Sequence, residues 1–361
     1  MRIRLVCEGW GDTGLTGPMR IRYAVAGMPI EHSLSPVLAV LIATHLKQAE
    51  LEVEFEEINL VESKDVTAPM AWAWAKNNRQ ENSIRNQLYG DPSTQTSNSQ
   101  LHRIAAKVIS EVKTAHSSHV PHGDTLFHRG EERIKTRRGE NESWISLTSP
   151  LKHLLSSRSG VHPIDDCLEN GAVNQLRWDG NNWFCAGTDG SGLVTLARHF
   201  GFNFEAEGVE NPLLCMVGGG GSARSCASAW AAAGGSIWSV GGRRSLGKRG
   251  SWFENVISGD DVAGNVGMRL FIDFDIEPGV LDSNQSTDAD LHLISTYNSQ
   301  GIGSVIEQNE SGIRLDGRWL LAAQHLDAWA RIFSPEAAHL LPGLGLTMTR
   351  LLAMESALRA D

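Results

Sequence analysis

Alternating apolar and polar residues predict short β-strands in the first half of this chain. The stretches Ile21–Ala26 and Leu51–Leu60 alternate in this way. Between them, a mostly apolar run follows Ser35-Pro36 and predicts a helix with Ser35 as its N-cap. Three more strands and a helix are predicted further on, at Trp144–Leu147, Gly171–Leu176, Trp183–Ala186 and Ser191–Phe200.

The second half reads as a repeating strand and helix pattern. The apolar strand Leu213–Val217 leads into a glycine-rich turn, a helix, a second glycine-rich turn and the strand Ser236–Val240. Two more strands are predicted at Leu270–Phe274 and Leu291–Ser295, and an apolar-periodic helix at Leu344–Ala360. Alternation of strands and helices favours a parallel sheet.

Residues 77–142 differ in character, because Asn, Ser, Gln, Arg, Glu and His dominate there. Only Leu101–His116 carries a helical period. We interpret the segment as a long surface insertion with one amphipathic helix and partly disordered flanks, and expect Trp72 and Trp74 to pack it onto the core. Its histidines follow no helix face and lie near no cysteine, so we interpret them as solvated rather than metal-binding: His102, His116, His119, His122 and His128.

Together these patterns predict an α/β protein of two domains. We expect a flexible leader over residues 1–18, because the tetrapeptide MRIR recurs at position 19 after an aperiodic glycine-rich stretch. A substrate-binding domain over residues 19–195 would carry the insertion, and a Rossmann-like domain would span residues 196–340. The helix in residues 341–361 is expected to return to the first domain.

Composition narrows the class of protein. The 361 residues are 41% hydrophobic and 20% charged, which is typical of a globular protein. A net charge of −10 argues against a general nucleic-acid binder, and the apolar runs are shorter than the ~20 residues of a membrane span. Five cysteines without a C-x-x-C pair argue against a disulfide framework or a zinc site and favour the cytoplasm. Monomer and homodimer both remain open.

The loop after Leu213–Val217 has the composition of a phosphate-binding turn. Glycines allow a tight turn and let a pyrophosphate approach the N-terminus of the next helix, where free N–H groups attract anions. A glycine run alone is a weak signal, but here it lies between a strand and a helix. The residues expected to contact a dinucleotide are Gly218, Gly220, Gly221, Ser222 and Ala223.

The end of the second nucleotide-binding strand indicates which dinucleotide binds. An acid there would accept hydrogen bonds from the adenosine ribose and mark NAD. The sequence instead has Arg243 and Arg244. Because guanidinium groups suit a 2′-phosphate, we expect NADP as the cofactor. A solvated basic turn is the alternative interpretation.

Three further clusters are unremarkable when taken singly. Ser33 and Ser35 at a helix start can bind a carboxylate, yet a simple N-cap is more common. Lys152 in SLTSPLK would ordinarily be a solvated lysine, and Asp189 in GTDGSG an ordinary turn residue.

In combination, however, the segments resemble the shikimate dehydrogenase family. YAVAGMPIEHSLSP resembles its opening strand and serine loop, SLTSPLK its N-V-T-x-P-x-K motif, and GAVNQL its G-A-V-N-T motif. GTDGSG is similar to N-T-D-G-x-G, and VGGGGSAR to the nucleotide loop G-x-G-G-x-x-R. The five motifs occur in family order from Tyr23 to about Met354, interrupted by the insertion.

The resemblance implies a reaction and a set of roles. The reaction is NADPH-dependent reduction of 3-dehydroshikimate to shikimate, on the route to chorismate and the aromatic amino acids. Lys152 and Asp189 would form the catalytic pair. The implied substrate contacts are Ser33 and Ser35 for the carboxylate, with Ser146, Thr148 and Asn174, beside the catalytic pair, for the ring. Alternatives are a quinate/shikimate dehydrogenase acting on another ring, or a non-catalytic relative that binds a nucleotide or metabolite.

The chain also departs from the family pattern. Ser146 and Gly187 stand where the family has asparagines, and Ala39-Val40 replaces a His-Asn pair. In the family's G-x-x-M-L-x-x-Q motif, GLTMTRLL puts Leu352 at the glutamine. No counterpart of the family's substrate-contacting tyrosine can be placed. These changes leave the catalytic pair intact but remove contacts to ring hydroxyls.

Overall fold

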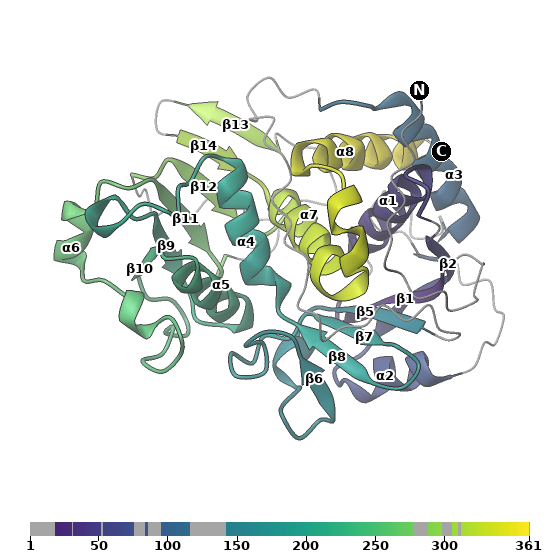
Figure 1. The fold of residues 1–361 in the computed structure, drawn as a ribbon, viewed down its shortest axis with the longest axis horizontal. Helices are drawn as coiled ribbons and strands as arrows, with labels where there is room; N and C mark the ends of the chain where they lie inside the picture. The colour runs from purple at the N-terminus through teal and green to yellow at the C-terminus, as the bar shows by residue number, and fades with distance from the viewer. Residues whose placement is uncertain are drawn as a thin grey trace, which may run out of the picture.

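The computed structural model describes residues 19–30, 32–51, 53–75, 84–85, 95–115, 142–276, 288–297, 305–309 and 312–360. Two six-stranded sheets lie at opposite ends of the molecule, with a layer of helices between them (Figure 1). The expected leader and the histidines at positions 116, 119, 122 and 128 lie outside the described residues.

The first sheet is mixed and has the order β2-β1-β5-β7-β8-β6. β1 is parallel to both of its neighbours, whereas β7 is antiparallel to β5 and β8. Its strands are β1 (Met19–Gly27), β2 (Val53–Glu62), β5 (Glu142–Leu147), β6 (Val161–Pro163), β7 (Gln175–Trp178) and β8 (Trp183–Ala186). The associated helices are α1 (Ser35–Gln48), α2 (Thr67–Trp74) and α3 (Asn98–Glu111), and β3 (Ile84–Arg85) pairs with β4 (Gln95–Thr96) in a separate ribbon.

The second sheet has the order β10-β9-β11-β12-β14-β13 and is parallel except at β13. The predicted parallel sheet is therefore confirmed. Its strands are β9 (Leu213–Val217), β10 (Ser236–Ser239), β11 (Arg269–Asp273), β12 (Leu291–Ile294), β13 (Ile306–Asn309) and β14 (Gly312–Leu315). The helices α5 (Gly221–Ala232) and α6 (Gly259–Gly264) belong to this half.

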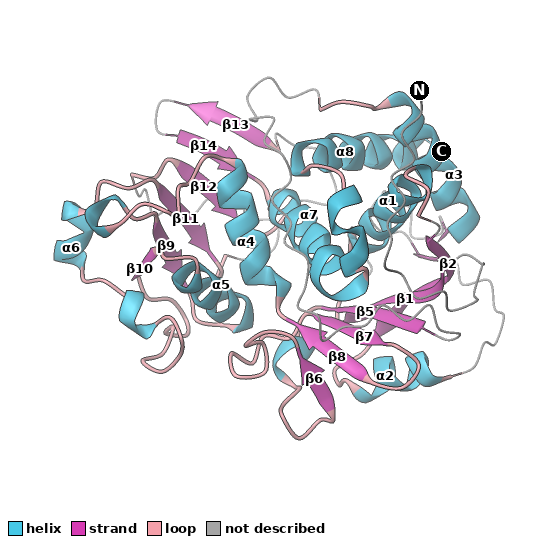
Figure 2. Cartoon of the chain, viewed as in Figure 1, coloured by secondary structure: helices cyan, strands magenta, loops and turns pink. Residues whose placement is uncertain are grey.

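Helices lie between the two sheets, as Figure 2 shows. α4 (Thr188–His199) lies against both α5 and α7 (Gly317–Ala328), and α7 also contacts α1 and α8 (Leu344–Ala360). Glycine makes these crossings possible. A Cβ on Gly190 would lie 2.1 Å from the Ser225 carbonyl oxygen, and one on Gly192 would lie 2.8 Å from the Gln324 nitrogen.

The chain returns to the first sheet before its last helix. A short π-helix, Trp329–Phe333, continues α7 and contacts β7 and β8. The Trp144 ring on β5 meets Trp329 edge-on at 5.0 Å between centroids and stacks on Phe333 at 4.8 Å. The chain thus rejoins the first half already with α7, which begins at Gly317, whereas the sequence predicted that it would do so only at residue 341.

The described part of the expected insertion contradicts the surface interpretation. α3 buries Leu101, Ile104 and Val108 in the main core and packs against α1 and α8. A helix with one apolar face buries that face against its neighbours, and the neighbours of α3 are the core helices α1 and α8. α3 is therefore an integral part of the fold.

The two tryptophans before the expected insertion also pack differently from the prediction. Trp72 lies under the Arg22 guanidinium, 4.4 Å from it, and donates to Glu57. Trp74 packs edge-on against Trp178 and Trp183. Within the described residues, both therefore cover the first sheet and do not hold α3.

Three predicted boundaries were wrong by a few residues. Ser35 is the first helical residue of α1, and Leu34 is its N-cap. The strand predicted over Gly171–Leu176 begins only at Gln175, and the helix predicted from Ser191 begins at Thr188. The last two shifts place Asn174 and Asp189 at element ends, where side chains can converge.

Two further observations concern the described residues alone. None of their helices is both long and apolar enough to cross a membrane. Nor do their His, Cys, Asp and Glu side chains form a group of three or more that could hold a metal ion. The cysteines among them are buried free thiols: Cys167, Cys185, Cys215 and Cys226.

Candidate active site

An ion pair between Lys152 and Asp189 lies where the two halves meet. Lys152 is on a 3₁₀ turn after β5, and Asp189 is in the first turn of α4. The lysine Nζ lies 2.6 Å from Asp189 Oδ2. The carboxylate is fully buried, whereas the lysine side chain keeps 21% of its exposure. A buried carboxylate thus holds an ammonium group that can still reach a ligand.

Asn174 fixes the geometry of this carboxylate. Its amide nitrogen donates to Asp189 Oδ1 at 2.8 Å, and its carbonyl oxygen accepts from the Thr188 backbone N–H at 2.7 Å. The Asn174 side chain therefore caps the start of α4 and orients Asp189 from the side opposite Lys152. With 3% exposure, Asn174 supports the pair more directly than it can contact a ligand.

The second half of the chain contributes a third group. Lys152 Nζ also donates to Ser222 Oγ at 3.1 Å, and Ser222 lies in the first turn of α5. The sequence analysis assigned Ser222 to the cofactor. The structure brings Ser222, Asp189 and Lys152 together around one ammonium group.

The glycine loop passes close to this ammonium group. Gly218 has φ +100°, which favours glycine, and a Cβ on Gly219 would lie 2.1 Å from the Ser245 carbonyl oxygen. α5 then begins at Gly221 behind Gly220, which supplies no side-chain cap. The first N–H groups of α5 are thus left to bind an anion. A Cβ on Gly221 would lie 3.8 Å from Lys152 Cβ, so the loop borders the ion pair.

The basic turn after β10 has an acidic neighbour that the sequence analysis missed. Asp275 accepts from the Arg243 backbone N–H, and the Arg243 guanidinium donates to the Asp275 carbonyl at 3.1 Å. Arg243 keeps 71% of its side-chain exposure, and Arg244 is exposed. Asp275 follows β11, two strands along in sequence from the glycine loop, so no local pattern around Arg243 could have indicated it.

The serine loop of the first half is contacted by a tyrosine from the second. The Tyr297 hydroxyl accepts from the Leu34 backbone N–H at 3.3 Å, between Ser33 and Ser35. Burial raises the pKa of Tyr297 to about 12, so its phenol remains a neutral donor. Tyr297 follows β12 in a stretch without a recognisable motif, which is why the sequence analysis placed no tyrosine here.

The Ser146 hydroxyl is already hydrogen-bonded within the protein. Its Oγ lies 2.8 Å from the Tyr23 hydroxyl and donates to Gln175 Oε1 at 2.9 Å. Gln175 in turn donates to Thr188 Oγ1 at 3.3 Å. Burial is the main cause that raises the pKa of Tyr23, which also keeps this phenol neutral. A chain of hydrogen bonds therefore runs beneath the ion pair from β1 to α4.

A glutamine at family spacing lies in α7 rather than α8. Gly317–Gln324 reads GRWLLAAQ, which has the spacing G-x-x-L-L-x-x-Q. Gln324 lies beside Gly192, one turn along α4 from Asp189. Leu352 lies in α8, which packs on α1, α3 and α7. The structure therefore favours Gln324 over Leu352 as the counterpart of that motif.

Neither a protein-family model nor a curated protein matches this sequence. Solved structures do match. Shikimate 5-dehydrogenase from Thermus thermophilus in complex with NADP(H) and shikimate has a TM-score of 0.53 at 18% identity, covering 92% of this chain and 99% of that one. The same enzyme in complex with shikimate has a TM-score of 0.51 at 18% identity, with the same coverage.

A larger protein, dehydroquinate dehydratase and shikimate dehydrogenase from S. pombe, is similar at a TM-score of 0.51 and 12% identity, over 92% of this chain and 53% of that one. At identities this low, the structural matches establish the architecture alone. The chain has the two-domain α/β fold of the shikimate dehydrogenases, as the sequence predicted.

Proposed function

We propose that this protein is an NADP-dependent oxidoreductase that reduces 3-dehydroshikimate to shikimate in the cytoplasm. The observation that carries the proposal is the Lys152–Asp189 pair, 2.6 Å apart, beside the first turn of α5. A reductase needs a proton donor next to its hydride donor, and this arrangement supplies one at the edge of a glycine loop.

The chemistry of the pair suits carbonyl reduction. Hydride addition to a ketone builds negative charge on the carbonyl oxygen. Lys152 would donate a hydrogen bond to that oxygen and then its proton, which leaves a hydroxyl group. Asp189, which is fully buried, would hold the ammonium in place.

The glycine loop fits a dinucleotide. Gly218, Gly219 and Gly220 bring bare backbone to the uncapped start of α5, where a pyrophosphate is stabilised. When bound, NADPH supplies the hydride. Gly221, Ser222 and Ala223 form the first turn of α5 and would line the phosphate site.

Arg243 and Arg244 would bind the 2′-phosphate of NADPH. Both are exposed at the turn after β10. Asp275 partly neutralises Arg243, so Arg244 would carry more of the preference for the phosphate.

The substrate would lie across the first half with its carboxylate on Ser33 and Ser35. Thr148 and Gln324 would contact ring hydroxyls, and the Tyr297 phenol would close the carboxylate end. The Leu34 contact supports that placement, because it brings the phenol to the serine loop.

A related ring is a second candidate substrate, and one observation favours it. The Ser146 hydroxyl is already engaged by Tyr23 and Gln175. One contact expected for shikimate is therefore missing, which leaves room for a ring whose pattern of hydroxyl groups differs from that of shikimate, a quinate-type ring included.

Initial rates of NADPH oxidation would test the proposal. Purified protein is assayed with 3-dehydroshikimate and with 3-dehydroquinate, each with NADPH and with NADH. We expect the highest kcat/KM for 3-dehydroshikimate with NADPH. A preference for 3-dehydroquinate would support the altered ring, whereas NADPH binding without turnover on either ring would favour a non-catalytic binding protein.

A further inference from the structure

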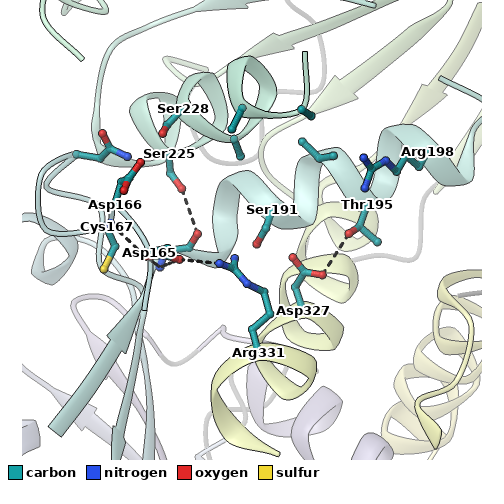
Figure 3. A pocket seen from close by; sticks show the side chains of 16 residues that line it. Asp165, Asp166, Cys167, Ser191, Thr195, Arg198, Ser225, Ser228, Asp327 and Arg331 are labelled. Carbon is teal, nitrogen blue, oxygen red and sulfur yellow. Dashed lines mark hydrogen bonds and ion pairs between the residues drawn. The ribbon is translucent and has the colours of Figure 1, made fainter. Parts of the chain in front are cut away.

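A cavity of about 340 Å³ lies on the face of α4 that points away from Asp189. Its walls are α4, α5, the loop over residues 165–170 and the end of α7 with its π-helix (Figure 3). On α4 the lining residues Ser191, Thr195 and Arg198 are spaced four and three apart and so share one helix face. Asp189 lies two residues before Ser191 and faces Lys152 instead.

One helical segment contributes both an acidic and a basic side chain to the wall of this cavity. Asp327 in α7 and Arg331 in the following π-helix are four residues apart, and Figure 3 shows both side chains directed into the cavity. The Arg331 guanidinium makes a single contact of 3.4 Å, to Asp165. Its side chain forms no hydrogen bond with the described residues, so most of its five N–H donors remain for a ligand carboxylate.

One buried polar side chain at the cavity wall lacks a partner among the described residues. Ser191 Oγ is buried without a hydrogen bond. Asn170 also lines the wall and is 7% exposed as a whole residue. Because an unmade buried hydrogen bond is costly, the Ser191 hydroxyl indicates a polar ligand.

The charge balance selects the class of ligand. Asp165, Asp166 and Asp327 outnumber Arg198 and Arg331, so a simple anion would meet an excess of carboxylates. A zwitterion avoids this repulsion. Apolar atoms of Val194 and Ala232 complete the wall and leave room for a side chain.

We propose that this cavity binds a free α-amino acid with an apolar side chain. Its carboxylate would be held by Arg331 and its ammonium group by Asp327. Its side chain would lie against Val194 and Ala232. The site is separate from the proposed reaction, because Asp189 and Ser222 do not line it.

Isothermal titration of the full chain, without cofactor or substrate, tests this site. L-leucine is compared with isocaproate, which lacks the amine, and with isoamylamine, which lacks the carboxylate. We expect saturable binding of leucine with a Kd below about 1 mM and at least tenfold weaker binding of either analogue. Absence of leucine binding, or equal binding of isocaproate, would overturn the proposal.

Variants locate the binding. Asp327→Asn and Arg331→Gln should each weaken leucine binding at least tenfold. Ala232→Phe fills the cavity from an exposed position and should abolish binding without touching a charged group. Arg158→Gln removes an equal charge from an exposed position outside the cavity and should change nothing. Unchanged affinity in folded Ala232→Phe protein, judged by its Tm, would place leucine elsewhere.

Discussion

Replacing Lys152 with methionine separates the proposed chemistry from binding. Methionine keeps an unbranched chain of similar length but has no charge and no proton to donate. It removes the contacts to Asp189 at 2.6 Å and to Ser222 at 3.1 Å. Because the glycine loop is unchanged, NADPH should still bind.

Two magnitudes follow from the geometry. Loss of a positioned general acid lowers kcat by about 10²–10⁴. The Asp189 carboxylate is fully buried and, among the described residues, keeps Asn174 as its one remaining side-chain donor, so the variant should also lose stability. Breaking a buried pair costs about 3–5 kcal/mol, and partial exposure of Lys152 reduces the expected loss to about 1–3 kcal/mol.

The assay measures kcat with NADPH and 3-dehydroshikimate, alongside NADPH affinity by fluorescence and stability by urea unfolding. His153→Gln changes the exposed neighbour and serves as the control. If Lys152→Met protein keeps kcat within about threefold of the original, Lys152 is not the proton donor.

Three further predictions test other parts of the account. Gln175→Thr should raise KM for the ring substrate, because Gln175 links Ser146 to Thr188 beneath the ion pair. A double-mutant cycle with Ser146→Asn, evaluated on kcat/KM, should give a coupling energy of about 0.5–3 kcal/mol, and additive effects would mean that the two residues influence the reaction independently. Replacing Arg243 and Arg244 together with glutamine should weaken NADPH at least tenfold more than NADH in titrations, and equal losses would contradict the 2′-phosphate assignment. Burial lowers the pKa of His325 from 6.5 to about 4, so the unfolded chain takes up a proton at higher pH than the folded protein does, and the free energy of unfolding falls as the pH drops from 6.5 to 4. The loss is at most about 3 kcal/mol. Urea unfolding at pH 7 and pH 4.5 should show this loss in the original protein, and His325→Leu should abolish the His325 contribution.

Much of the fold was predictable because its signals are local. The strand Leu213–Val217, the glycine turn and the helix Leu344–Ala360 were predicted from apolar periodicity and turn residues, and the structure confirms them. α7 was missed, although its apolar residues are dense. It is buried on several sides, so no polar face marks it as amphipathic.

The site was predictable only in part. Lys152 and Asp189 were chosen by resemblance, and the structure brings them into contact. Asp275 and Tyr297 reach the site from ends of distant strands, where no sequence motif marks them. Their placement depends on how the two sheets face each other, which is a property of tertiary packing.

The most direct test of the central claim is the stoichiometry of product formation. Protein, NADPH and 3-dehydroshikimate are incubated, the loss of NADPH is followed by absorbance, and shikimate is quantified by chromatography. The account predicts one shikimate for each NADPH consumed, at a rate that depends on Lys152. Intact NADPH and no shikimate, with protein that binds both ligands, would contradict it.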